Sequence, residues 1–169
     1  KEDTRKEAKA YREAIALEPD QPVAYYNLGV ALHSSGHFVE AAQRYLEARE
    51  RYPVGSERWA QATAAAFDLL SLEECAEAAK PEWWNDEALK ALSARVLRAA
   101  PNEESALDMR AYVLSGAYGD AWEAGPRSAA ELKEAAALFD RSAAMCNAPA
   151  WKAQKVSLAD WCRSQAEAM

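Results

Sequence analysis

The chain is poor in the residues that interrupt helices. Its 169 residues include only 6 glycines and 7 prolines. An all-β chain needs a turn about every ten residues, and most turns depend on these two residue types. Apolar residues nevertheless make up 50% of the chain, and many of them are alanine, the strongest helix former. The composition therefore predicts an all-α protein.

Cysteine is also scarce. The three cysteines, Cys75, Cys146 and Cys162, are widely spaced and form no Cys-x-x-Cys pair. An odd number of isolated cysteines is typical of free thiols in a reducing compartment. We therefore expect an intracellular protein, either in the cytoplasm or in an organelle after removal of a targeting peptide.

The residues and motifs of common catalytic and metal sites are few. The two histidines, His33 and His37, have the i, i+4 spacing of a helical metal site, but residues 34–36 read Ser-Ser-Gly and should break the helix between them. The chain has no nucleophile elbow, phosphate-binding loop, dinucleotide fingerprint or HExxH motif. The sequence predicts no metal, no cofactor and no enzymatic activity.

Long apolar runs and an excess of positive charge are absent as well. The longest apolar stretch, residues 64–70, contains Asp68 and is far shorter than the roughly 18–20 residues that span a bilayer. The net charge is −7, and an acidic surface repels phosphate backbones. We expect neither membrane insertion nor nucleic-acid binding. Residues 1–13 are rich in Lys and Arg, but interleaved acids predict an ion-paired, solvated helix face.

The sequence contains segments with helical periodicity, and proline, glycine and capping residues separate one segment from the next. We expect eight helices, near residues 2–17, 22–33, 38–51, 56–79 with a break at 71, 86–100, 104–117, 128–146 and 149–167. Asp86 should cap the helix that follows it, and Ser128 with Glu131 has capping-box spacing.

One segment recurs. Residues 11–19 begin with Tyr-x-Glu-Ala and end in Pro, and residues 45–53 do the same thirty-four positions later. A period of this length is typical of stacked helix hairpins, whose function is usually to bind other molecules.

Residues 22–53 resemble a tetratricopeptide repeat over its whole length. Eight residues stand where that family places its aromatic, leucine, small, packing and terminal proline residues: Tyr25, Leu28, Gly29, Leu32, Ala41, Tyr45, Ala48 and Pro53. We expect Gly29 and Ala41 to lie where the two helices cross most closely. The resemblance implies a right-handed α–α superhelix, a TPR-like solenoid of about eight helices in antiparallel pairs.

The resemblance also implies the organisation of the chain. We expect one domain, 1–169, without a flexible linker. Its parts are the second helix of a truncated repeat at 1–19, the best-matched repeat at 22–53, a divergent repeat with a Trp insertion at 56–100, a divergent repeat with a long loop at 104–146 and a capping helix at 149–167.

For function, the resemblance implies a protein-interaction module: an adaptor, assembly factor or scaffold that binds a peptide or helix in a groove lined by the first helix of each repeat. The expected groove residues are Val23, Tyr26, Asn27, Val30, His33, Gln61 and Asp68. Some family members hold a C-terminal carboxylate in this groove with cationic residues. Glu57 and Gln61 stand where such residues would be needed, so we do not expect that activity.

A second interpretation is a structural, peripheral subunit of a large organellar or membrane-associated complex. Here the edge of the solenoid and two aromatic insertions would contact the neighbours. The insertion residues are Trp83, Trp84, Tyr118 and Trp122. Adjacent aromatics cannot both face one core from a regular helix, and an exposed Trp is a common interface anchor. Packing of these side chains under the insertions is the competing reading. The partner and the oligomeric state stay open.

Overall fold

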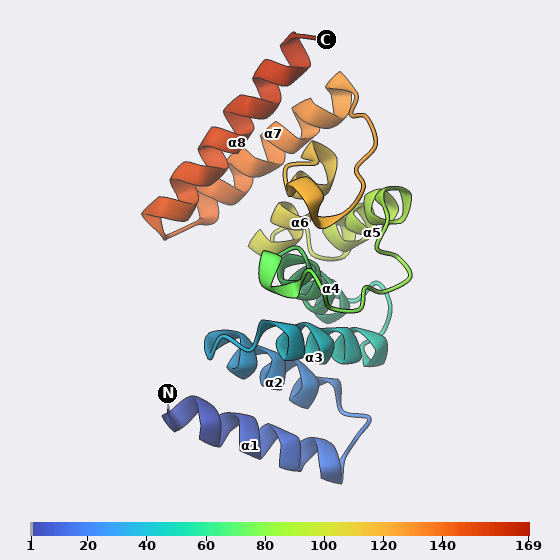
Figure 1. Ribbon diagram of the computed structural model, residues 1–169, viewed down its shortest axis with the longest axis vertical. Helices are drawn as coiled ribbons and strands as arrows, with labels where there is room; N and C mark the ends of the chain where they lie inside the picture. Colours follow the sequence, from blue (N-terminus) through green and yellow to red (C-terminus); the bar gives the residue numbers. More distant parts are fainter. Residues whose placement is uncertain (1) are drawn as a thin grey trace. The chain divides into compact units, whose positions relative to one another are not determined.

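The structure, a computed structural model, describes residues 2–169 (Figure 1). Every regular element in that range is helical, with eight α-helices, two 3₁₀ turns and no strand. The prediction of an all-α protein is confirmed. The chain divides into two compact units, unit 1 at Lys1–Lys80 and unit 2 at Pro81–Met169. Because the boundary lies inside the repeat expected at 56–100, the expectation of one continuous domain stays a prediction.

Unit 1 contains four α-helices that pack in chain order. They are α1 (Glu2–Leu17), α2 (Pro22–Ser34), α3 (Phe38–Arg51) and α4 (Glu57–Leu70), followed by the 3₁₀ turn η1 (Glu73–Cys75). The principal contacts join α1 to α2, α2 to α3 and α3 to α4. Short turns between consecutive helices favour antiparallel neighbours of this kind.

The turn between α2 and α3 is a Schellman motif. Gly36 has a φ of 83°, and its N–H donates to the His33 carbonyl at 3.0 Å. The His37 N–H donates to the Leu32 carbonyl at 2.9 Å. This pair of bonds satisfies carbonyls that the end of α2 leaves open. The predicted break between His33 and His37 is thus confirmed.

The α2–α3 hairpin depends on a glycine that lies against an aromatic ring. A Cβ added to Gly29 would meet the Tyr45 ring, with Cε1 at 2.8 Å and Cδ1 at 2.9 Å. These ring atoms are nearer to Gly29 than any atom of Ala41, which is itself fully buried. The missing side chain of Gly29 therefore makes room for the Tyr45 ring. That α2 and α3 cross most closely at Gly29 and Ala41 stays a prediction.

Unit 2 also packs its helices in chain order. It contains α5 (Asp86–Ala99), α6 (Glu104–Ser115), the 3₁₀ turn η2 (Gly119–Ala121), α7 (Ala129–Met145) and α8 (Pro149–Glu167). The principal contacts join α5 to α6, α6 to α7 and α7 to α8, and α7 and α8 run side by side in Figure 1. Leu107, Leu114, Phe139 and Cys162 belong to the buried cluster between α6, α7 and α8.

The ends of two helices test the capping predictions. The Ser128 side chain accepts from the Glu131 N–H, and the Glu131 carboxylate accepts from the Ser128 N–H, so the predicted capping box is confirmed. The expected cap at Asp86 is wrong. Asn85 caps α5 by accepting from the Ala88 N–H at 3.0 Å, and this leaves the Asp86 carboxylate available for other partners.

Among the described helices, none has the length and apolar character to cross a lipid bilayer.

Candidate partner-binding surfaces

Helix α2 carries no charged residue along its 13 positions. One face is buried and supplies the core with Ala24, Tyr25, Leu28, Gly29, Ala31 and Leu32. The opposite face keeps apolar side chains in solvent, with Val23 51% and Val30 42% exposed. A surface helix usually places polar or charged residues on its outer face. The outer face of α2 is therefore unusually easy to desolvate.

Two of the predicted groove residues border a crevice between α1 and α2. Val23 and Asn27 line a cavity of about 360 Å³ together with Tyr11, Ala14 and Leu17 of α1. Leu17 is 83% exposed, which adds apolar surface at the mouth of the crevice. The crevice thus combines apolar walls with two amides, Asn27 and Gln21, that can donate and accept hydrogen bonds, and with the Glu18 carboxylate.

Tyr26 and Asp68 approach a common residue on α3. The Tyr26 and Tyr45 rings are 5.3 Å apart between centroids. Burial raises the pKa of Tyr45, and the nearby Tyr26 and Asp68 raise it further. Tyr26 of α2 and Asp68 of α4 are therefore both close enough to Tyr45 to act on it, although they are forty-two positions apart in sequence.

The two remaining predicted groove residues are Gln61 on α4 and His33 at the end of α2. Gln61 is partly buried on α4, seven positions before Asp68 and so on the same helix face. His33 stands at the end of α2, where its ring meets the Phe38 ring edge-on at 5.8 Å. Among the described residues no group of three His, Cys, Asp or Glu is placed to hold a metal ion.

In unit 2 the two aromatic insertions contact each other. The first insertion is residues 81–85 and the second is residues 115–127. The Trp84 indole N–H donates to the Ala121 carbonyl at 2.8 Å, and the Trp84 ring meets the Trp122 ring edge-on at 6.2 Å. Trp83 lies next to Trp84 with 5.9 Å between ring centroids. The insertions stabilise one another, as the packing interpretation expects.

Asp86 is the centre of this arrangement, a role that the sequence did not indicate. Its carboxylate accepts two hydrogen bonds from the Arg127 guanidinium, at 2.5 and 2.8 Å. It also accepts from the Trp122 indole N–H at 3.0 Å and the Gly125 N–H at 3.2 Å. The Arg127 hydrogen bond, with these further donors, lowers the pKa of Asp86 to about 2 despite partial burial. An Asp at a helix start is usually a cap, and no spacing links residue 86 to residue 127.

The fourth insertion residue, Tyr118, is also engaged within unit 2. Its ring stacks on Tyr112 with 4.1 Å between centroids, and Tyr112 meets Phe139 edge-on at 5.1 Å. All four predicted insertion residues therefore contact other side chains of the unit. Their binding to a partner stays a prediction.

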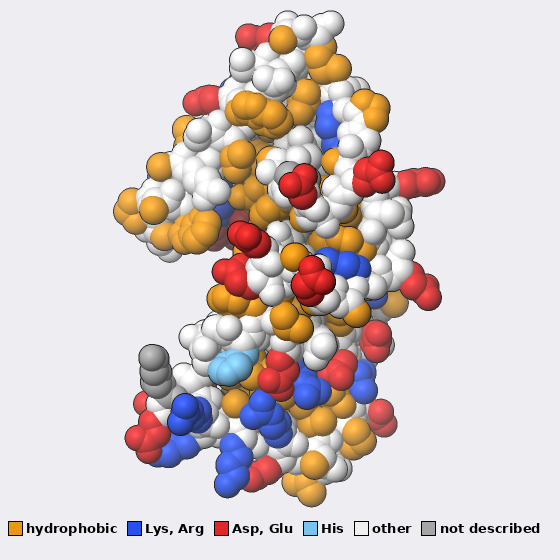
Figure 2. Space-filling view, viewed as in Figure 1, with side chains coloured by type: hydrophobic (Ala, Val, Ile, Leu, Met, Phe, Trp, Pro, Cys, Tyr) orange, Lys and Arg blue, Asp and Glu red, His pale blue; other side chains and the backbone are white. Residues whose placement is uncertain are grey.

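The largest exposed aromatic side chains are on α8. Trp151 is 61% and Trp161 44% exposed, while Ala159 and Cys162 of the same helix are fully buried. Figure 2 shows apolar side chains gathered on the visible face of α8. The tryptophans are evident in the sequence, but their exposure depends on which face of α8 packs on α7.

Comparison with known families gives a match in unit 1. Residues 8–36 match the family model described as TPR repeat. The chain is similar to the TPR repeat family. The matched segment runs from the middle of α1 through α2 to Gly36, so it includes the α1–α2 crevice and the uncharged face of α2. TPR repeats generally mediate protein–protein interactions, and the family is typically non-enzymatic. Comparison with curated proteins gave no match.

Proposed function

We propose that this chain is a non-enzymatic protein-interaction module, an adaptor, assembly factor or scaffold, and that unit 1 binds a peptide or helix of a partner on α2 and α4. The single observation that carries the proposal is the outer face of α2, which lies inside the TPR-like segment and exposes Val23 and Val30 without any neighbouring charge on the helix.

The physical chemistry of that face suits a partner's apolar side chains. Burying a half-exposed valine stabilises a complex by about 1 kcal/mol, and no charge on α2 must be desolvated first. Tyr26, Asn27 and Gln61 supply hydrogen-bonding groups that can fix the register of the partner, and Asp68 favours a basic residue nearby. Apolar contacts would give most of the affinity and polar contacts the specificity.

Paired substitutions test the proposal. In Val30→Glu a charge enters the uncharged face, and burying it unpaired against a partner costs several kcal/mol. Val39→Glu is the matched control, because Val39 is 38% exposed on α3. Each variant is used to capture partners from the cells of origin, with identification by mass spectrometry. We expect Val30→Glu to lose a protein that wild type and Val39→Glu both retain. Equal capture by all three would contradict the proposal.

A second candidate, the structural subunit, is favoured by Trp151 and Trp161 of α8. Both side chains are more exposed than Trp84 and Trp122. If the chain is a subunit of a large complex, Trp151→Ala with Trp161→Ala should shift it from a high-mass to a low-mass fraction on native gels, while Val30→Glu should not. The opposite pattern supports the α2 surface.

The proposal also covers the class of the partner and the cellular compartment of the chain. We propose a protein partner, with neither nucleic-acid binding nor membrane insertion, in a reducing intracellular compartment. The fully buried thiols of Cys75 and Cys162 support that compartment, since burial raises the pKa of both, that of Cys162 to about 11, and keeps them un-ionised. Fractionation of the native cells tests this placement.

A further inference from the structure

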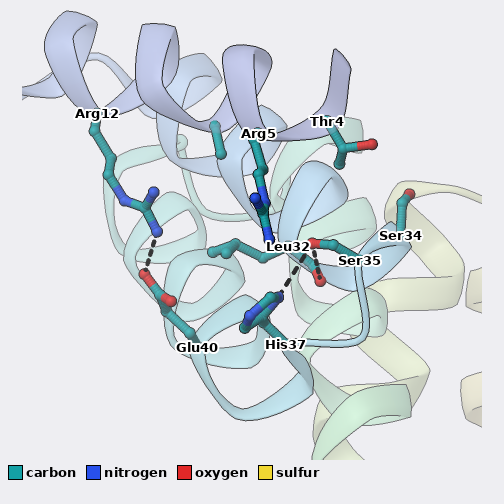
Figure 3. Close-up of a pocket in the computed structure, with 9 residues that line it drawn as sticks. Thr4, Arg5, Arg12, Leu32, Ser34, Ser35, His37 and Glu40 are labelled. Carbon is teal, nitrogen blue, oxygen red and sulfur yellow. Dashed lines mark hydrogen bonds and ion pairs between the residues drawn. The ribbon is translucent and has the colours of Figure 1, made fainter. Parts of the chain in front are cut away.

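A second cavity of unit 1 lies apart from the α2 face. It has a volume of about 530 Å³ and is bounded by the first three turns of α1 and by the α2–α3 turn (Figure 3). Its size is within the range of roughly 300–1,000 Å³ that is usual for ligand pockets. The lining residues are Thr4, Arg5, Ala8, Arg12, Leu32, Ser34, Ser35, His37 and Glu40.

Arg5 is the free cation of this cavity. Among the residues that the structure describes, it forms no ion pair or hydrogen bond through its side chain. Figure 3 shows Arg5 extending from α1 toward Ser35 and His37 on the opposite wall. A guanidinium is always charged and presents a planar set of donors that matches a carboxylate. Arg5 is therefore not among the ion-paired residues expected on α1.

The one acid in the lining is already shared. The Glu40 carboxylate lies 3.0 Å from the Arg12 guanidinium and 3.7 Å from that of Arg44. Arg44 does not line the cavity and pairs more closely with Glu47, at 2.9 Å, so the lining itself holds one carboxylate against the two guanidinium groups of Arg5 and Arg12. Figure 2 shows Lys and Arg side chains gathered beside a histidine on the visible face of unit 1. The cavity is locally positive.

Neutral donors complete the lining. Among the described residues, the hydroxyls of Thr4 and Ser34 make no hydrogen bond, so both can donate to a ligand. The Ser35 hydroxyl is directed to the Ala31 carbonyl at 2.8 Å, and His37 Nδ1 lies 3.2 Å from the same hydroxyl oxygen. The wall beneath the donors is apolar, formed by Ala8 and Leu32.

We propose that this cavity binds a Glu or Asp side chain of an acidic segment on a partner protein, with Arg5 as the principal contact. The net charge of −7 opposes such a ligand at long range, but charges farther away than about 8 Å are largely screened at physiological ionic strength. The local charge of the cavity therefore determines whether an acidic side chain binds there. A nucleic acid would need many cations along a track, whereas this site offers one free guanidinium.

The test uses a short, fluorescein-labelled, glutamate-rich peptide with an amidated C-terminus, titrated with the whole chain and followed by fluorescence anisotropy. Arg5→Gln should weaken binding about tenfold, the effect of losing one charge-assisted hydrogen bond. Lys6→Gln is the matched control. Lys6 is the next residue on α1 and pairs with Glu2 at 3.2 Å, but it does not line the cavity. It should change the affinity less than twofold.

Three results would overturn the proposal: no binding of the glutamate peptide, equal losses in Arg5→Gln and Lys6→Gln, or tighter Arg5-dependent binding of a single-stranded oligonucleotide. A glutamine-rich peptide with a free C-terminus separates the two sources of carboxylate, and Arg5-dependent binding of that peptide alone also contradicts it. Val30→Glu should bind the glutamate peptide as wild type does. The peptide titration therefore tests this cavity separately from the proposed binding of a partner on α2.

Discussion

Gly29 shows how one absent side chain sets the geometry of a hairpin. The Tyr45 ring occupies the space beside Gly29, and Tyr45 is 3% exposed and packed against Tyr26. The sequence correctly marks Gly29 as a small-residue position, because the family pattern requires one there. It does not reveal that the ring of Tyr45 fills the space, since that depends on the rotation of α3 about its axis.

Gly29→Ala should destabilise the chain. Alanine in a helix interior is favourable by about 1 kcal/mol over glycine, but overpacking against a buried ring costs about 1–3 kcal/mol. We expect a net loss of about 1 kcal/mol in the free energy of unfolding, measured by urea denaturation. In a Tyr45→Leu background the ring is gone, so the same substitution should be neutral or stabilising. Equal effects in both backgrounds would contradict the packing argument.

Asp86 shows a role that no local pattern encodes. The sequence identifies the Ser128 capping box because its two partners are three residues apart, and the structure confirms it. The partners of Asp86 lie 36 to 41 residues away in the second insertion. Nothing in the periodicity of α5 indicates them, so the expectation of a simple helix cap was wrong.

Asp86→Asn should reduce stability in a pH-dependent way. The pKa of Asp86 is about 2 in the folded state, against about 3.9 for an unperturbed Asp. The stabilisation is therefore fully present above pH 4 and is lost as the pH falls toward 2. We expect a loss of roughly 2 kcal/mol at pH 7, shrinking as the pH falls from about 4 toward 2. Glu87→Gln, in the same helical turn, should have little effect. A pH-independent difference would contradict the ion-pair account.

At the scale of elements, α8 is joined to α6 and α7 by a buried lysine. Lys155 is 5% exposed. Its ammonium lies 2.5 Å from Glu104, 2.9 Å from Asp108 and 2.7 Å from the Ser142 hydroxyl. Burial alone would lower the pKa of Lys155, but its bonds to Glu104 and Asp108 raise it. Burial raises the pKa of Asp108.

Lys155→Met should loosen α8, because removing one partner of a buried ionic cluster leaves the other charges uncompensated. The expected loss is about 3 kcal/mol in the free energy of unfolding, followed by urea titration and tryptophan fluorescence. Lys152→Met, three residues earlier on the exposed side of α8, should cost less than about 0.5 kcal/mol. If both variants lose the same stability, the cluster does not hold α8 in place.

The elements themselves are largely predictable from the sequence. Each helix has its own apolar stripe and its own breakers, and these are local signals that Pro22, Gly36 and Ser128 illustrate. The packing of the two insertions and the Lys155 cluster are not predictable in this way. Both join residues far apart in the chain, and the residue types Trp, Asp and Lys do not by themselves reveal which distant residues they contact.

At the scale of the whole molecule, an acidic chain carries two chemically different surfaces in unit 1. One is the uncharged face of α2, within the segment that matches the TPR repeat. The other is the locally positive cavity beside Arg5. The sequence predicted residues of the first surface, because the repeat pattern orients α2. It did not predict the second, because residues 1–13 carry both signs of charge and only the structure shows which cation is left unpaired.

Site-specific photo-crosslinking can show whether a partner protein binds on the outer face of α2. A benzophenone amino acid is placed at position 30 or, as the control, at position 39 of the full chain in its native cells. The account predicts a discrete crosslinked protein from position 30 that position 39 does not give. Crosslinks from position 39 but not from position 30 would contradict binding on the outer face of α2. So would crosslinks from positions 151 and 161 of α8 when neither position 30 nor position 39 gives any.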